Sequence, residues 1–319
     1  MKTYLGLDLG GTNAKYGLVS EEGRVLRRGR FPVLAERGPE PIINDIVRHL
    51  GQLLKDLPED GRPAGLAVGA AGVILPDQGV LAAAPNLPGW RDIPLAARLS
   101  EALGLEARIE NDANLFTLGE WLAGAGRGLR NMVGLTLGTG VGGGLILNGR
   151  LWNGSFGTAA EIGHVPVEPE GRECGCGGRG CLETISSATA IANTARDLIA
   201  RGGGCAYHGP PGELTAARLH ELAAQGDPVA LAAFGRAGWG LGVALAGVFN
   251  LLGLEGAVFG GGAAPAWEYI YPTMYAEFAA RVLAVDPEKV RFVTAALGDD
   301  APLIGATALY TTDAQDRED

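Results

Sequence analysis

The stretch Tyr4-Leu5-Gly6-Leu7-Asp8-Leu9-Gly10-Gly11-Thr12 is an apolar strand that runs into a glycine turn. Its pattern returns at Val133-Gly134-Leu135-Thr136-Leu137-Gly138-Thr139-Gly140. Each copy continues into a second predicted strand and then a hairpin-like turn. In the first copy the second strand is 14–19 and the turn is Glu22-Gly23-Arg24-Val25. In the second copy the strand is 144–147 and the turn is Asn148-Gly149-Arg150-Leu151. The order strand, glycine turn, strand, turn, strand occurs twice, and two matched halves predict two domains that face each other.

Helical and strand patterns alternate after each hairpin. Residues 40–54 carry apolar side chains at helical spacing, and so do the later helical segments. Strands are expected at 65–70, 107–110 and 257–259, and helices at 95–103, 187–201, 215–224, 229–252, 267–283 and 301–309. This alternation predicts the α/β class with a largely parallel sheet.

Length and composition exclude several classes of protein. The chain has 319 residues, of which 47% are apolar and 19% charged, so it is a folded protein of roughly two domains. The net charge of −10 disfavours a nucleic-acid partner, because binding a phosphate backbone needs clustered Lys and Arg. No targeting segment precedes Tyr4, so we expect a cytoplasmic protein. The most apolar stretch, 237–249, is shorter than the ~20 residues of a membrane helix and predicts a buried helix instead.

Asp8 ends the first strand, directly before the turn Gly10-Gly11-Thr12-Asn13. Such glycines let backbone N–H groups approach a polyphosphate, and a carboxylate there suits the accompanying Mg²⁺. The turn is neither a Walker A loop, since the required Lys is missing, nor a dinucleotide fingerprint, since a strand follows it. An ordinary glycine hairpin is the alternative.

Two further turns resemble it. Gly138-Thr139-Gly140 is the matching turn of the second half, where the Thr139 hydroxyl could bind a phosphate oxygen. Gly260-Gly261-Gly262 follows a strand and precedes a helix, where backbone could pass close to a nucleotide base or ribose. Each turn is a weak signal alone, and the three together are stronger.

Glu110-Asn111-Asp112-Ala113-Asn114 ends a strand and opens a helix. Asp112 is placed to accept a proton from a sugar hydroxyl that attacks a γ-phosphate, and Asn111 to hydrogen-bond the sugar. The alternative is that one of these two residues is only a helix N-cap.

His164 and the cluster Cys174-Gly175-Cys176-Gly177-Gly178-Arg179-Gly180-Cys181 form the strongest local signal. One imidazole and three thiolates make a Cys₃His set, the ligand count of a closed structural zinc site. Glu161 and Glu183 flank this loop, with exposed surface acids as the alternative for each. Asn86 lies in Asn86-Leu87-Pro88-Gly89-Trp90, which reads equally well as a substrate contact or as a plain turn.

Taken together, these residues resemble the ROK family of repressors, open-reading-frame kinases and sugar kinases, within the actin-like ATPase-domain superfamily. The resemblance covers nearly the whole chain. It rests on Asp8 to Thr12, on Glu110 to Asn114, and on Glu161-Ile162-Gly163-His164 with the cysteine cluster through Glu183.

The resemblance implies two actin-like, ribonuclease H-like α/β domains with ATP and a sugar in the cleft between them. The domains would be 1–113 with the C-terminal helix 300–319, and 114–299 with a zinc loop at 164–183. Asp112 would be the general base and Asp8 would help to hold Mg²⁺. The implied phosphate contacts are Gly10, Gly11, Thr12, Asn13, Gly138, Thr139 and Gly140, and the implied adenosine contacts are Gly260, Gly261 and Gly262. The implied sugar contacts are Asn86, Asn111, Asp112, Glu161, His164 and Glu183. The implied zinc ligands are His164, Cys174, Cys176 and Cys181.

Among family activities, the motifs resemble those of glucokinases most, which implies transfer of the ATP γ-phosphate to the 6-hydroxyl of glucose. N-acetylhexosamine and fructose kinases share these motifs and remain alternatives. A repressor carries a helix-turn-helix before the first glycine turn, and only seven residues precede Asp8. A non-catalytic sugar sensor would need neither Asp112 nor two phosphate turns. We also expect a homodimer or a higher homo-oligomer that binds no nucleic acid and no membrane.

Overall fold

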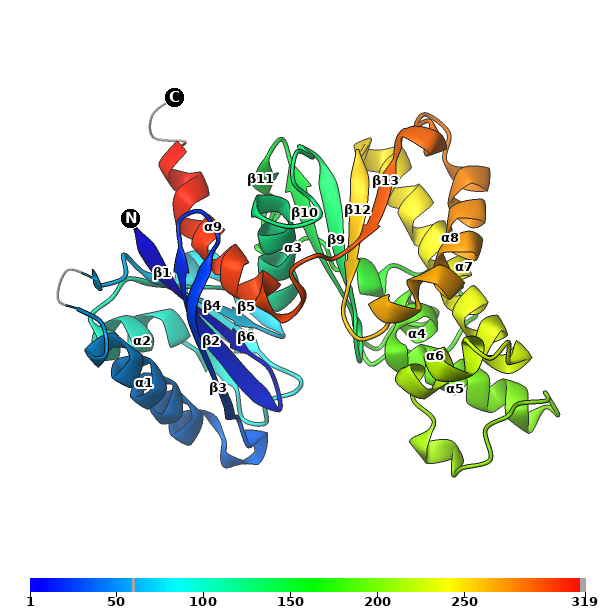
Figure 1. Cartoon of the computed structure of the whole chain (residues 1–319), viewed down its shortest axis with the longest axis horizontal. Helices are drawn as coiled ribbons and strands as arrows, with labels where there is room; N and C mark the ends of the chain where they lie inside the picture. Colours follow the sequence, from blue (N-terminus) through cyan, green and yellow to red (C-terminus); the bar gives the residue numbers. More distant parts are fainter. Residues whose placement is uncertain (59–60, 316–319) are drawn as a thin grey trace. The chain divides into compact units, whose positions relative to one another are not determined.

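A computed structural model describes residues 1–58 and 61–315 of the chain (Figure 1). It divides into two compact units. Unit 1 comprises residues 1–130, 144–159 and 296–319, and unit 2 comprises residues 131–143 and 160–295. The domain boundary at residue 113 stays a prediction.

The main sheet of unit 1 has the strand order β3-β2-β1-β4-β8. Its strands are β1 (Thr3–Leu9), β2 (Asn13–Ser20), β3 (Val25–Pro32), β4 (Leu66–Ala70) and β8 (Ala107–Asn111). The first three are antiparallel and form the predicted hairpins, whereas β4 and β8 run parallel to β1. The carboxyl ends of β1, β4 and β8 therefore meet at one edge of the sheet.

Helices cover both faces of this sheet. The helices of unit 1 are α1 (Pro39–Lys55), α2 (Leu95–Leu103), α3 (Asp112–Leu122) and α9 (Ala301–Gln315). Leu5, Leu7 and Leu9 of β1 belong to one buried cluster with the apolar faces of α1 and α2. Gly6 points the other way, since a side chain there would meet the Leu303 carbonyl oxygen of α9 at 2.8 Å. Asp8 shares this α9-facing side, because alternate residues of a strand face alternate sides.

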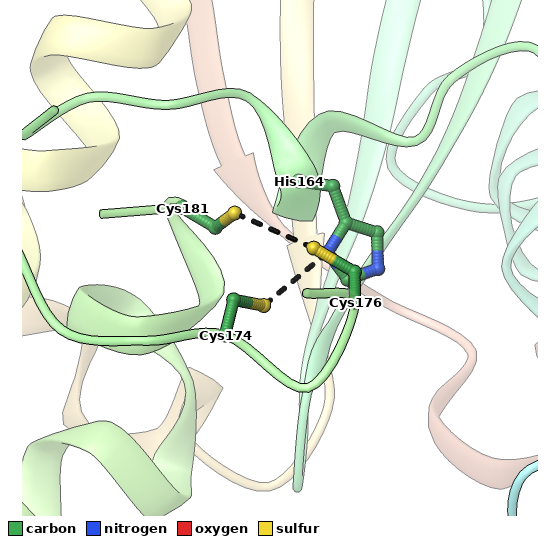
Figure 2. Close-up of side chains that lie close together, drawn as sticks. All are labelled: His164, Cys174, Cys176 and Cys181. Atoms are coloured by element: carbon green, nitrogen blue, oxygen red, sulfur yellow. Dashed lines mark hydrogen bonds between the residues drawn. The ribbon is translucent and has the colours of Figure 1, made fainter. Parts of the chain in front are cut away.

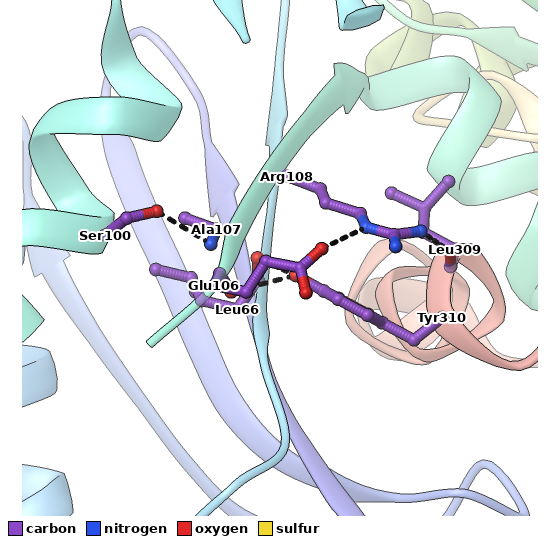
Figure 3. Close-up of polar contacts among 7 residues, drawn as sticks. All are labelled: Leu66, Ser100, Glu106, Ala107, Arg108, Leu309 and Tyr310. Carbon is purple, nitrogen blue, oxygen red and sulfur yellow. Dashed lines mark hydrogen bonds and ion pairs between the residues drawn. The ribbon is translucent and has the colours of Figure 1, made fainter. Parts of the chain in front are cut away.

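Tyr310 anchors the far end of α9 to the sheet (Figure 3). Its hydroxyl lies 2.8 Å from the Leu66 carbonyl oxygen and 2.9 Å from that of Glu106. Arg108 lies over the Tyr310 ring, 4.4 Å from its centroid, and pairs with the Glu106 carboxylate at 2.9 Å. The Tyr310 ring also stacks on Tyr4 of β1. These contacts fix α9 against β1, β4 and β8.

A small antiparallel sheet, not predicted from the sequence, follows β4. Its strands are β5 (Val73–Leu75), β6 (Val80–Ala83) and β7 (Arg91–Ile93), in the order β5-β6-β7. Strands of three or four residues are too short to show an alternating pattern, and prolines and glycines interrupt the segment.

The second sheet repeats the strand order of the first, β11-β10-β9-β12-β13. Its strands are β9 (Met132–Leu137), β10 (Val141–Leu147), β11 (Arg150–Leu151), β12 (Gly256–Gly260) and β13 (Arg291–Thr294). In both sheets the first strand is central, the two strands on one side of it form an antiparallel pair, and the two strands on the other side run parallel to it. Asn148 and Gly149 both have positive φ, as the predicted two-residue hairpin requires. The internal repeat is confirmed.

The helices of unit 2 are α4 (Glu183–Ser186), α5 (Ala188–Ala200), α6 (Ala216–Ala223), α7 (Pro228–Leu252) and α8 (Trp267–Arg281). By length and composition α7 could cross a membrane, but 67% of its most apolar window is buried inside the protein. Ala237, Leu241, Leu245 and Phe249 are all fully buried. The helix is thus placed as a core helix, as the sequence predicted.

Candidate active site and metal centre

The first glycine turn joins β1 to β2 and lies against Asn86. The Gly10 N–H donates to the Asn13 carbonyl at 3.1 Å and closes the turn. A side chain at Gly11 would begin 3.1 Å from the Asn86 Cβ and 3.2 Å from its carbonyl oxygen, so the close approach favours glycine. Thr12, Asn13 and Asn86 are exposed. One predicted sugar contact thus lies beside the predicted phosphate turn.

Asp8 and Asp112 belong to the same edge of the first sheet. Asp8 pairs with Gly69, which pairs in turn with Glu110, two residues before Asp112. A side chain at Gly69 would meet Leu115 Cδ1 of α3 at 2.9 Å and lie 3.6 Å from the Asp112 Cα, so this glycine lets the first turns of α3 pack close to the strand. Burial raises the pKa of Asp8 to about 6, and the charge of Asp112 adds to this. Burial also raises the pKa of Asp112. A bound cation would favour the ionised form of both acids, which fits an Mg²⁺ site at Asp8.

Asn111 is the N-cap of α3. Its Oδ1 accepts hydrogen bonds from the N–H groups of Ala113 at 2.9 Å and Asn114 at 3.3 Å. Its Nδ2 donates to the Gly72 carbonyl at 3.3 Å. The capping role considered from the sequence therefore belongs to Asn111, and Asp112 is the first residue of the helix. Sugar binding by either residue stays a prediction.

The second glycine turn lies against Glu183. The Gly138 N–H donates to the Gly140 carbonyl at 3.0 Å, which closes the turn. The Glu183 carboxylate accepts from the Val141 N–H at 3.0 Å, and a side chain at Gly140 would lie 2.2 Å from its Oε2. Gly140 therefore makes room for this carboxylate. The structure places Glu183, predicted as a sugar contact, against the second predicted phosphate turn.

The third glycine turn adjoins the second. A side chain at Gly261, where φ is +85°, would lie 2.7 Å from the backbone of Leu137. The Ala263 N–H donates to the Leu137 carbonyl at 2.9 Å. The Gly260–Gly262 segment therefore lies against the strand end that leads into Gly138.

Figure 2 shows His164, Cys174, Cys176 and Cys181 gathered around one point. Their ligand atoms all lie within 4.8 Å of one another. His164 Nδ1 is 3.6 Å from Cys174 Sγ, and the sulfurs of Cys176 and Cys181 are 3.8 Å apart. In a tetrahedral zinc site with ordinary Zn–S and Zn–N bonds, such pairs are about 3.6 Å and about 3.8 Å apart. The residues present therefore fit zinc, and 3.8 Å is far too long for a disulfide.

The loop that carries the thiols has little regular structure of its own. The Cys174 N–H donates to the Gly178 carbonyl at 2.8 Å, and Gly177 returns a bond to Cys174 at 2.9 Å. Burial raises the pKa of Cys181 to about 12, so this thiol is protonated until a metal displaces the proton. Cys174 also donates to Glu183 Oε1 at 3.8 Å. Glu183 thus links the predicted zinc loop to the second glycine turn.

Glu161 follows a strained residue. Ala160 has φ +67°, which an L-residue with a side chain rarely adopts. The Ile162 N–H donates to the Ala160 carbonyl at 2.7 Å, and Glu161 has φ −70° and ψ +51°. This is an inverse γ-turn. The turn leads directly into the short helix Ile162–His164, so Glu161 and the predicted zinc ligand are held by adjacent turns.

Comparison with known proteins decides the family. A model of the ROK family matches residues 4–313. The chain belongs to the ROK family. It is 36% identical over 313 residues to a glucokinase of Thermotoga maritima, with 96% of each chain covered.

Solved structures of ROK proteins match nearly the whole length of this chain. A ROK glucokinase from Streptomyces griseus, solved in complex with glucose and AMPPNP, matches with TM-score 0.81 and 31% identity over 97% of this chain and 99% of that one. A ROK hexokinase from Thermus thermophilus matches with TM-score 0.82 and 29% identity over 98% and 99%. The predicted actin-like ATPase fold is confirmed.

Sequence reasoning missed one residue that shapes this ROK site, Gly69. A lone glycine inside the apolar strand Leu66–Ala70 signals a close approach to the strand, so a clue was present. No local pattern pointed to the contact between Glu183 and the turn at Gly140.

Proposed function

We propose that this ROK protein is a glucokinase that transfers the γ-phosphate of ATP to the 6-hydroxyl of glucose. The observation that carries the proposal is the placement of Asp8 and Asp112 at the carboxyl edge of one sheet, with the glycine turn shortly after Asp8. The similar T. maritima protein is a glucokinase, and the S. griseus structure holds glucose and an ATP analogue.

In the proposed reaction Asp112 accepts the proton of the 6-hydroxyl as its oxygen forms a bond to the γ-phosphorus. The bond from that phosphorus to the ADP oxygen breaks, and ADP leaves. The raised pKa of Asp112 makes this carboxylate a better proton acceptor. Asp8 would hold Mg²⁺, which neutralises phosphate charge.

The phosphates are assigned to the backbone of Gly10 to Asn13 and of Gly138 to Gly140, and the adenosine to Gly260 to Gly262. The sugar is assigned to six residues: Asn86, Asn111, Asp112, Glu161, His164 and Glu183. His164 turns Nδ1 toward the thiols, which leaves Nε2 for a sugar hydroxyl. A zinc ion held by His164, Cys174, Cys176 and Cys181 would close the loop that leads into α4, where Glu183 lies, with no part in the chemistry.

A coupled assay of the purified protein tests the proposal against glucose, N-acetylglucosamine, N-acetylmannosamine and fructose with ATP and Mg²⁺. Glucose should give the highest kcat/KM. A higher value for another sugar would replace glucose and keep the kinase. No turnover with any sugar would overturn the kinase itself and favour a non-catalytic sugar sensor.

We propose a cytoplasmic homo-oligomer that binds no nucleic acid, in keeping with the net charge of −10. Light scattering of the purified protein tests the oligomer, and a gel-shift assay tests the absence of DNA binding.

A further inference from the structure

Glu110 is a buried carboxylate near the end of β8. It is 1% exposed and is the last residue but one of β8. Its Oε1 accepts hydrogen bonds from the backbone N–H of Asn111 at 2.7 Å and from Asn114 Nδ2 at 2.9 Å. Its Oε2 accepts from Asn153 Nδ2 at 2.8 Å. A carboxylate is expensive to bury, so three donors around it mark a site that the fold maintains.

The donors lie on both sides of Asp112. Asn111 precedes Asp112 and caps α3, whereas Asn114 belongs to the first turn of the helix. Glu110 therefore holds the last peptide of the strand and the first turn of the helix with one carboxylate oxygen. The other oxygen holds Asn153, which also lies 3.3 Å from Asn114. Asp112 and Ala113 are the two residues between Asn111 and Asn114, so both neighbours of this short step are tied to Glu110.

Glu120, at the opposite end of α3, provides the comparison. It is fully buried and accepts hydrogen bonds from the backbone N–H groups of Ala125, Ala296 and Leu297 at 2.8 to 3.1 Å. It resembles Glu110 in burial and in its number of donor groups. None of its partners adjoins Asp112, so Glu120 stabilises the helix without touching the catalytic end.

We propose that Glu110 is a positioning residue, whose carboxylate fixes the backbone on both sides of Asp112 so that this base meets the sugar hydroxyl at the right distance and angle. The inference rests on the proposed kinase activity. A misplacement of a reacting group by about 1 Å costs on the order of 100-fold in rate, so a network that sets this position is worth keeping at the cost of burying a charge.

Glu110→Gln tests the proposal, with Glu120→Gln as its matched control. Glutamine keeps the size but turns one acceptor into a donor, which then faces a donor of Asn111, Asn114 or Asn153. We expect kcat with glucose to fall about 10- to 100-fold while KM for ATP stays within about twofold. Glu120→Gln should lower the melting temperature and leave kcat unchanged.

A double-mutant cycle separates positioning from general damage. In an Asp112→Asn background there is no base left to position, so Glu110→Gln should change the residual rate by less than about twofold. An equal fall in both backgrounds, or an unchanged kcat for Glu110→Gln alone, would overturn the inference. If Glu110→Gln does not fold, Asn153→Ala carries the test, since it removes one donor and should lower kcat only when Asp112 is present. A wild type without kinase activity would instead refute the proposed function.

Discussion

The two glycine turns look alike in sequence, yet their acidic neighbours are held in different ways. Asp8 lies in β1 and Asp112 directly follows β8, and both strands pair with β4, so backbone hydrogen bonds of the sheet set the separation of the two acids. Glu183 reaches the second turn from α4, directly after a loop that carries the thiols. One arrangement depends on the sheet and the other on a loop that fits a metal ion. The two should therefore fail under different treatments.

The variant with the largest expected effect is Asp112→Asn, which tests the two acids that the first sheet holds. The amide keeps the size of the side chain and removes the base, so kcat should fall by ~10² to 10⁴ or more. Steady-state kinetics with glucose measure this, and zinc content and circular dichroism should match the wild type. Full activity would remove Asp112 from the mechanism.

Cys176→Ser disrupts the loop that carries the predicted zinc ligands. Cys205→Ser is the control, because Cys205 lies outside this cluster. The first variant should lose zinc and raise the sugar KM by about 10- to 100-fold, because the loop that supports Glu183 and His164 loosens. It should keep most of its helical circular dichroism, since each unit has its own core. Metal analysis and calorimetric titration with glucose measure both effects. A metal-free wild type with full activity, or a zinc-free variant that binds glucose normally, would contradict the assignment.

The pH dependence of stability probes the acid pair without substrates. The pKa of Asp8 is raised from 3.8 to about 6, so the folded state holds a proton that the unfolded state has lost between these values. Stability should accordingly fall as the pH rises through about 4 to 6 in the absence of Mg²⁺ and ATP. The Asp8→Asn variant has no carboxyl group to ionise at this position, so its free energy of unfolding should not fall in this pH range. At pH 7.5 it should exceed that of the wild type by about 1–2 kcal/mol, after allowance for the partial exposure of Asp8.

Asp45→Asn is the control, because the stability that Asp45 contributes should change with pH in the opposite direction. Hydrogen bonds from Arg48 and Arg37 lower the pKa of Asp45, so its contribution is present above the unfolded pKa and is lost in acid. Urea unfolding of both variants between pH 4 and pH 8 separates them. An Asp8→Asn variant that is less stable than the wild type at pH 7.5 would show that burial does not penalise this charge.

The smallest expected effect concerns the turn before Glu161. Ala160→Gly relieves a positive φ, and the gain exceeds the extra chain entropy of glycine by roughly 0.5 kcal/mol. Ala159→Gly, where φ is not positive, should destabilise the protein instead. Thermal unfolding of both variants measures the difference. A destabilised Ala160→Gly would mean that the alanine methyl group packs well enough to outweigh its strain.

The parts of the molecule predicted from sequence are those in which residue type dictates conformation. Asn148-Gly149 requires a tight hairpin, and the apolar spacing of residues 40–54 requires an amphipathic helix, so both were found. The small sheet β5-β6-β7 was missed because its strands are too short for a pattern. The neighbours of Glu183 were missed because the residues that touch lie 42 positions apart, and nothing local encodes that contact. Asn111 was left open between cap and sugar ligand, since both uses need the same side chain.

The packing of α9 on β1 has a consequence for protein synthesis. Unit 1 is assembled from three separate stretches, and the ring of Tyr310 stacks on that of Tyr4. A ribosome makes β1 early and α9 last among the described elements, so the part of the unit 1 sheet that α9 covers stays exposed while the segments of unit 2 have all been made. During translation unit 2 should therefore become resistant to protease before unit 1, reversing the order in which their first strands are made.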